Sequence, residues 1–315
     1  LALALALAAS VPLAAQQEGR GETIPLRFGW EPGMRAEIDF EQVRLLRIGS
    51  ERDSVRLAAT YRMDVSAHEA GLAVEYSDLR WTALPPPRPG TGRFYEALVR
   101  VALGARPPSV VSRTGEFLRV EGAEQVAAQT GQALQPLLAG VRASLRESAQ
   151  AIIAAGLQPG ALRGAADAEW NRIVGMWAGQ ELVIGLPYTS EISSELPVLE
   201  GVAIPIHLKM RVVERIRCTP EDAEQRCVEM EVTSAPDQGA MTQAFTDFLA
   251  RTGLPDEQVQ AMFAQFNIQS SYRLHTDPRT LRPYYLQGVS TTTADPGAEE
   301  SSQVETRTFR FRYPP

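Results

Sequence analysis

Hydrophobic and polar residues alternate along the first third of this 315-residue chain, with the period of two that is typical of β-strands. The clearest run places apolar side chains at every second position, at Met34, Ala36, Ile38 and Phe40. Similar runs start at Val55 and Leu72, and a change of parity before Leu79 predicts a β-bulge. The pattern predicts an antiparallel meander with one face toward solvent.

From Glu124 the spacing of apolar residues lengthens to about 3.6, which predicts an amphipathic helix. We expect Pro136 to kink this helix or to begin a second one, because proline lacks a backbone donor. Asp167 is expected to cap a further helix that carries Trp170 and Trp177 on one face. Both tryptophans are interpreted as ordinary core.

Alternation returns in the second half, where residues 204–212 predict a long strand with a returning partner. We expect Val212 to face Val232, a register that sets Arg215 opposite Glu229. Two short helices then interrupt the sheet before the final strands. This order predicts an α+β fold: a large curved antiparallel sheet, half-barrel-like, with helices packed on one face.

The domain organisation follows from the same pass along the chain. Residues 1–15 alternate Leu and Ala without a charge, which predicts a signal peptide; the sequence begins inside the apolar run without Met, so we expect the peptide to be truncated at its start. Residues 16–315 are predicted to form a single α+β domain. An alternative is two similar halves, 24–122 and 180–315, joined by a helical segment over 123–179.

The expected location is the periplasm or the outside of the cell. No Cys follows the apolar run closely, and no later segment approaches the roughly 20 apolar residues of a spanning helix. We therefore expect a soluble mature chain with no stable membrane insertion. Cys218 and Cys227 enclose eight residues, and in an exported protein such a pair favours a disulfide over a metal or redox site.

Composition narrows the range of functions. The net charge is −7 and the 31 basic residues are scattered, so nucleic acid is not an expected partner. The common catalytic signatures are missing, and the three histidines, His68, His207 and His275, do not share metal-ligand spacing. Glu229 and Glu231 share the polar face of a strand, where solvation explains them better than acid–base chemistry. No catalytic residue, metal site or cofactor is predicted, and a non-enzymatic role is favoured.

One group of side chains suggests ligand binding. Flexible methionines and rigid phenylalanines recur on the two short helices, and such residues can line an apolar pocket. The predicted ligand-binding residues are Met241, Phe245, Phe248, Met262, Phe263 and Phe266. The alternative interpretation of the same stripes is ordinary core packing.

Three short motifs carry a resemblance: Trp30-Glu31-Pro32-Gly33, Ser112-Arg113-Thr114-Gly115-Glu116 and Leu274-His275-Thr276-Asp277-Pro278. With them the chain resembles uncharacterised exported bacterial proteins grouped as a domain of unknown function. More loosely, its layout resembles the half-barrel lipoprotein carriers and lipid-binding proteins of the bacterial periplasm, which implies lipid binding.

These observations leave three hypotheses for the function. The leading one is an envelope protein that holds an apolar ligand, a lipid or acyl chain, between sheet and helices. The second is a structural or protein-interaction module whose partner is another envelope protein. The third is an uncharacterised hydrolase-type enzyme.

Overall fold

The computed structural model describes residues 14–15, 21–84, 106–138, 143–195, 203–250, 267–294 and 301–314. Its strands are β1 (Ala14–Ala15), β2 (Thr23–Pro25), β3 (Arg35–Ile48), β4 (Glu51–His68), β5 (Gly71–Ala83), β6 (Ser109–Val111), β7 (Phe117–Val120), β8 (Glu181–Val183), β9 (Tyr188–Glu195), β10 (Ala203–Ile216), β11 (Cys227–Pro236), β12 (Asn267–Thr276), β13 (Pro283–Ala294) and β14 (Ser301–Arg312). Its helices are α2 (Ala123–Leu138), α3 (Ala143–Gly156), α4 (Pro159–Trp170), the π-helix η1 (Asn171–Gly175) and α5 (Gln238–Ala250).

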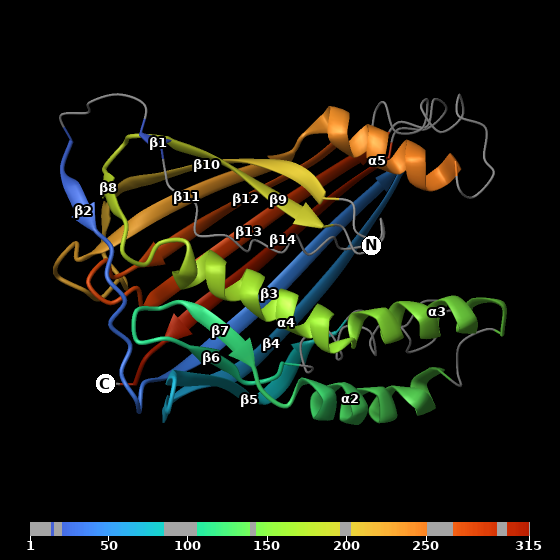
Figure 1. The fold of residues 1–315 in the computed structure, drawn as a ribbon, viewed down its shortest axis with the longest axis horizontal. Coiled ribbons are helices and arrows are strands. Elements are labelled where there is room, and N and C mark those ends of the chain that lie inside the picture. Colours follow the sequence, from blue (N-terminus) through green and yellow to red (C-terminus); the bar gives the residue numbers. More distant parts are fainter. Residues whose placement is uncertain are drawn as a thin grey trace.

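One large antiparallel sheet dominates the structure (Figure 1). Its strand order is β1-β9-β10-β11-β12-β13-β14-β3-β4-β5-β6-β7, and β2 pairs separately with β8. The last strand, β14, therefore lies in the middle of the sheet, beside β3. An α+β fold built on a large antiparallel sheet is confirmed. The sheet is open and uncurled, so the half-barrel curvature expected from the sequence is not observed.

The alternation read from the sequence separates two faces of this sheet. On the face that we call inner, Ile38, Phe40 and Met63 are buried, while Glu37 and Arg62 stand exposed on the opposite, outer face. The β-bulge predicted in the meander is confirmed by register shifts between β4 and β5. Apolar inner-face side chains and the residues packed on them form the main core.

The end of α4 and the π-helix η1 that follows it cover part of the inner face. Trp170, Ile173, Val174 and Trp177 are all at most 3% exposed and belong to the main core, as predicted for the two tryptophans. Figure 1 shows α4 crossing in front of the sheet, whereas α2 and α3 lie toward the side of β5 to β7. Among the helices that the structure describes, none combines the length and apolar character needed to cross a membrane.

An aromatic cluster explains the Trp30 motif. The rings of Trp30 and Trp170 meet edge to face at 5.1 Å, and Phe28 lies 5.9 Å from Trp170. The Trp30 indole donates a hydrogen bond to the carbonyl of Leu281, and the Trp170 indole donates to that of Gly115. Buried indole N–H groups need such acceptors, so the motifs around residues 30 and 115 hold core tryptophans in place.

The structure corrects one expectation about the helices and narrows another. Asp167 does not cap a helix but lies inside α4, which already begins at Pro159, a residue suited to the first helical turn. The Asp167 carboxylate accepts a hydrogen bond from the Asn171 side chain at 2.9 Å. Pro136 does not begin a second helix, because it lies inside α2, which continues to Leu138; the expected kink stays a prediction.

The pairing of β10 with β11 also differs from the expected register. Val212 faces Met230 rather than Val232, and a bulge beyond Val212 shifts the pairing by one residue. Arg215 consequently faces Val228 and binds Glu22 instead of Glu229. The disulfide predicted between the two cysteines at this hairpin is confirmed, with Cα atoms 5.0 Å apart.

Candidate functional site

A row of serines crosses the inner face of the sheet. Ser190 and Ser234 both lie opposite Leu208, Ser234 faces Ser270, and Ser270 faces Ser290. Directly opposed residues of an antiparallel sheet share a face, so these four serines line up across five strands. We call Ser190, Ser234, Ser270 and Ser290 the serine row.

The serine row interrupts an otherwise apolar surface. On their own strands Ser234 and Ser270 stand beside Val232 and Tyr272, which are at most 9% exposed. Serine at such a position forgoes roughly 1.5–3 kcal/mol of side-chain burial relative to Val or Leu. The Ser270 hydroxyl donates to that of Ser290 at 3.2 Å, whereas the buried Ser190 Oγ has no hydrogen-bond partner within the described chain. Packing alone does not explain the serine row.

Charged residues extend the same row. Ser290 faces Glu305, and Glu305 faces Arg44 on β3. The Glu305 carboxylate accepts hydrogen bonds from Arg44 at 2.9 and 3.1 Å and contacts Arg307 at 2.6 Å. The Glu305 side chain is 8% exposed, against 22% for Arg44 and 37% for Arg307. Burial alone would raise the pKa of Glu305, but the two guanidinium groups hold it below its ordinary value.

A third arginine reaches this region from η1. Burial lowers the pKa of Arg172 most, and repulsion by Arg307 lowers it further, while Tyr272 and Glu169 oppose the shift. Arginine nevertheless stays charged at neutral pH. The Arg172 backbone carbonyl accepts a hydrogen bond from the Trp177 indole at 3.1 Å, and the Arg172 guanidinium makes no hydrogen bond or ion pair with the described residues. We call Arg44, Arg172, Arg307 and Glu305 the arginine cluster.

A separate buried cation lies beneath α4. The Arg106 guanidinium stands 4.9 Å from the ring centres of both Tyr61 and Tyr76, and it pairs with Glu169 at 3.2 Å. Burial lowers the pKa of Arg106, but Glu169 and the two tyrosines outweigh that effect and raise it. Burial in turn raises the pKa of Tyr61 to about 12. The Glu169 carboxylate therefore already has a cationic partner in Arg106.

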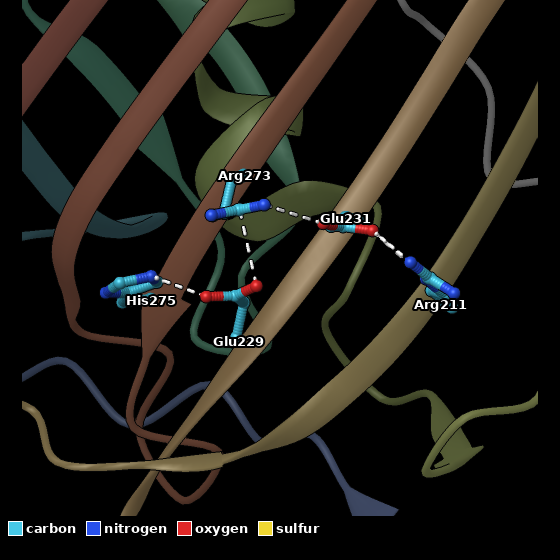
Figure 2. A network of polar contacts seen from close by, with 5 residues as sticks. All are labelled: Arg211, Glu229, Glu231, Arg273 and His275. Carbon is cyan, nitrogen blue, oxygen red and sulfur yellow. Dashed lines mark hydrogen bonds and ion pairs between the residues drawn. The ribbon is translucent and has the colours of Figure 1, made fainter.

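The outer face carries a network of charged side chains (Figure 2). Glu231 binds Arg211 at 2.7 Å and Arg273 at 3.0 Å, while Glu229 contacts Arg273 at 3.3 Å and His275 at 3.0 Å. Hydrogen bonding from Arg211 lowers the pKa of Glu231. Burial lowers the pKa of His275, against the opposing effect of Glu229. Each carboxylate thus has two basic neighbours, an arrangement typical of a cross-strand charge ladder.

A hollow of about 650 Å³ lies over the outer face of β9 to β12. It is lined by Glu191, His207, Lys209, Thr233 and Gln269 together with their strand neighbours. His207 lies 3.5 Å from both Glu191 and Asp237. No group of three or more residues suited to hold a metal ion occurs in the part of the chain that the structure describes.

The predicted ligand-binding residues are only partly described. Met241 lies in α5 and is 1% exposed, and Asp237 caps that helix by accepting a hydrogen bond from the amide of Ala240 at 2.7 Å. Phe245 and Phe248 also fall in α5, but their side chains are not described, and Met262, Phe263 and Phe266 lie outside the described residues. The apolar pocket predicted from this group stays a prediction.

Sequence reasoning missed both the serine row and the arginine cluster. A signal was present: Ser234, Ser270 and Ser290 occupy the parity that Val232, Tyr272 and Leu286 use for the core. Only the register across the strands shows that these positions meet.

No protein-family model matches the chain, and no curated protein shows significant sequence similarity to it. The resemblance based on the three motifs therefore stays a prediction. What the chain does has to be argued from its own geometry.

Proposed function

We propose that this chain is a non-enzymatic envelope protein that binds an apolar ligand, a lipid or acyl chain, against the inner face of its sheet. The serine row is the observation that carries the proposal. Small polar side chains at core positions bury less apolar surface and pack less tightly than Val or Leu would. In natural proteins such exceptions to close apolar packing are expected at functional sites.

The surroundings of the serine row suit a hydrocarbon chain. Ile206 and Ile268 flank the serine row on one side along the strands, and Val232 and Tyr272 flank it on the other. All four side chains are at most 9% exposed. An acyl chain over the row would contact apolar side chains on both flanks, at roughly 0.8 kcal/mol for each buried CH₂ group. Ser270 and Ser290 retain partial exposure, which leaves this stretch of the row accessible.

Two further observations favour an exported protein. The Cys218–Cys227 disulfide suits an oxidising compartment such as the periplasm or the cell exterior. The uncharged Leu/Ala run at the start of the sequence is typical of a secretory signal. Both support the proposed location.

The test compares two adjacent serines on opposite faces of β12. Ser270→Leu fills the serine row, and we expect it to weaken binding of a fluorescent acyl probe at least tenfold. Ser271→Leu adds the same side chain to the outer face and should leave binding within twofold of the wild type. Native mass spectrometry of protein extracted from the producing cells should show co-purifying lipid. If no lipid co-purifies and the wild type binds no acyl probe, the proposal is wrong.

The open sheet keeps a protein-interaction module as the second candidate. Within the described chain β7 pairs only with β6, so its other edge is free for strand addition by a partner. A partner cross-linked at β7, together with an inner face that takes up no lipid, would favour this second function.

A further inference from the structure

The arginine cluster has more positive than negative charge. Arg307 pairs with the Glu305 carboxylate, which also binds Arg44, whereas Arg172 pairs with no carboxylate among the described residues, so the charge of Arg172 is left uncompensated there. Unpaired charges inside a protein are costly, so a structure seldom keeps them unless something neutralises them.

Among the described residues, Glu169 is the carboxylate that attracts Arg172 electrostatically. It is bound by Arg106 at 3.2 Å, and that pair is itself neutral. Glu169 therefore does not cancel the excess charge of the cluster.

The cluster also offers hydrogen-bond donors without acceptors. The Arg307 Nε is buried and has no hydrogen-bond partner within the described residues, and Arg172 makes no side-chain hydrogen bond there. Ser290, at the end of the serine row, directly faces Glu305 and adds a hydroxyl beside the cluster. Arg307 is 37% exposed, so an incoming group has access to it. Guanidinium donors in such a setting match the geometry of carboxylates and phosphates.

We propose that the arginine cluster binds the acidic head group, a carboxylate or phosphate, of an amphiphile whose acyl chain lies along the serine row. This inference rests on the proposed function and names the ligand class as anionic lipids or fatty acids. Arg172 and Arg307 supply the charge that holds the head group, and Glu305 fixes Arg44 and Arg307 in position.

The experiment compares probes with the same twelve-carbon chain, each kept below its micelle concentration: dodecanoate, dodecyl phosphate and the neutral dodecanol. Inorganic phosphate serves as the head group without a chain. Binding to the full chain is measured by isothermal titration calorimetry. We expect at least one anionic amphiphile to bind tenfold or more tightly than dodecanol, and inorganic phosphate to bind much more weakly than dodecyl phosphate.

The matched variants are Arg172→Gln and Arg163→Gln. Arg163 lies on the exposed side of α4, about two and a half turns before Arg172, so both changes remove one charge from the same continuous helical segment. Arg172→Gln should fold, since it removes a desolvated cation without a partner, and should bring the affinity for the anionic amphiphile close to that for dodecanol. Arg163→Gln should change it less than twofold.

The possible failures are distinguishable. Equal binding of dodecanol and both anionic amphiphiles by the wild type, a measurement that needs no variant, would overturn this inference and leave the proposed function standing. Equal losses in Arg172→Gln and Arg163→Gln would overturn it too, as would inorganic phosphate binding as tightly as dodecyl phosphate. Failure of every amphiphile to bind would overturn the proposed function as well.

Discussion

Glu305 offers the sharpest test of how the inner face is held together. Its carboxylate, 8% exposed, lies between Arg44 and Arg307 at 2.9 and 2.6 Å. Glu305→Gln keeps the shape of the side chain but removes its charge. The two guanidinium groups then lose their shared counter-charge in a largely buried setting.

The expected loss of stability follows from this burial. Removing one partner of a buried ion pair costs about 3–5 kcal/mol, and exposed pairs are worth about 0–1 kcal/mol. Because Arg44 and Arg307 are 22% and 37% exposed, water can partly hydrate them, so we expect the lower end, about 3 kcal/mol. Glu37→Gln is the control: its side chain is 61% exposed where it meets Arg312, and its loss should stay below about 1 kcal/mol.

The measurement is urea unfolding at pH 7, because urea does not screen ion pairs as guanidinium chloride does. The pH dependence gives a second readout. The pKa of Glu305 lies below its ordinary value of 4.5 in the folded chain, so its contribution is complete above that value and is lost as pH falls through the folded pKa. The difference between wild type and Glu305→Gln should therefore shrink in acid. A loss no larger than that of Glu37→Gln at pH 7 would refute this reasoning.

Three further predictions address other parts of the fold. Arg106→Lys should lower the free energy of unfolding by about 1–2 kcal/mol, because a compact ammonium cannot replace the planar guanidinium that contacts both tyrosine rings; an unchanged urea midpoint would contradict this. Gly71→Ala should destabilise by more than 2–3 kcal/mol, roughly the upper range for backbone strain, since a Cβ would lie 2.2 Å from a carbonyl oxygen, while Gly33→Ala, with a positive φ but open space, should cost about 1 kcal/mol; equal thermal shifts would count against it. Replacing both Cys218 and Cys227 by Ser should cost about 2.5 kcal/mol for so short a loop, and a reductant should then no longer alter the melting temperature.

Alternation along single strands was enough to predict which residues face the core. Met34 to Phe40 and the run from Val55 are buried as their parity indicates, and the bulge near Leu79 is where the parity changes. The alternation within one strand depends only on residues that are neighbours in sequence. The predicted buried face is therefore correct whichever strands pair with it.

Long-range register could not be predicted in the same way. The pairing of β10 with β11 depends on a bulge after Val212 that leaves the apolar alternation before it intact. The serine row requires the register of five strands at once, and Arg172 reaches the sheet from a helix end whose orientation depends on the packing of Trp170 and Trp177. The candidate site arises from these tertiary relations, and no short motif encodes it.

The central position of β14 has a consequence for how the protein is made. Residues 301–312 are synthesised after every other strand of the described sheet, yet they join β13 to β3, a strand that is synthesised long before them. Until then the growing chain holds two sheet fragments with unpaired edges facing each other, a state prone to aggregation. Since Glu305 and Arg307 lie on that strand, a chain in which β14 has not yet joined the sheet cannot hold the ligand proposed here. Ligand binding would thus report that the two parts of the sheet have been joined.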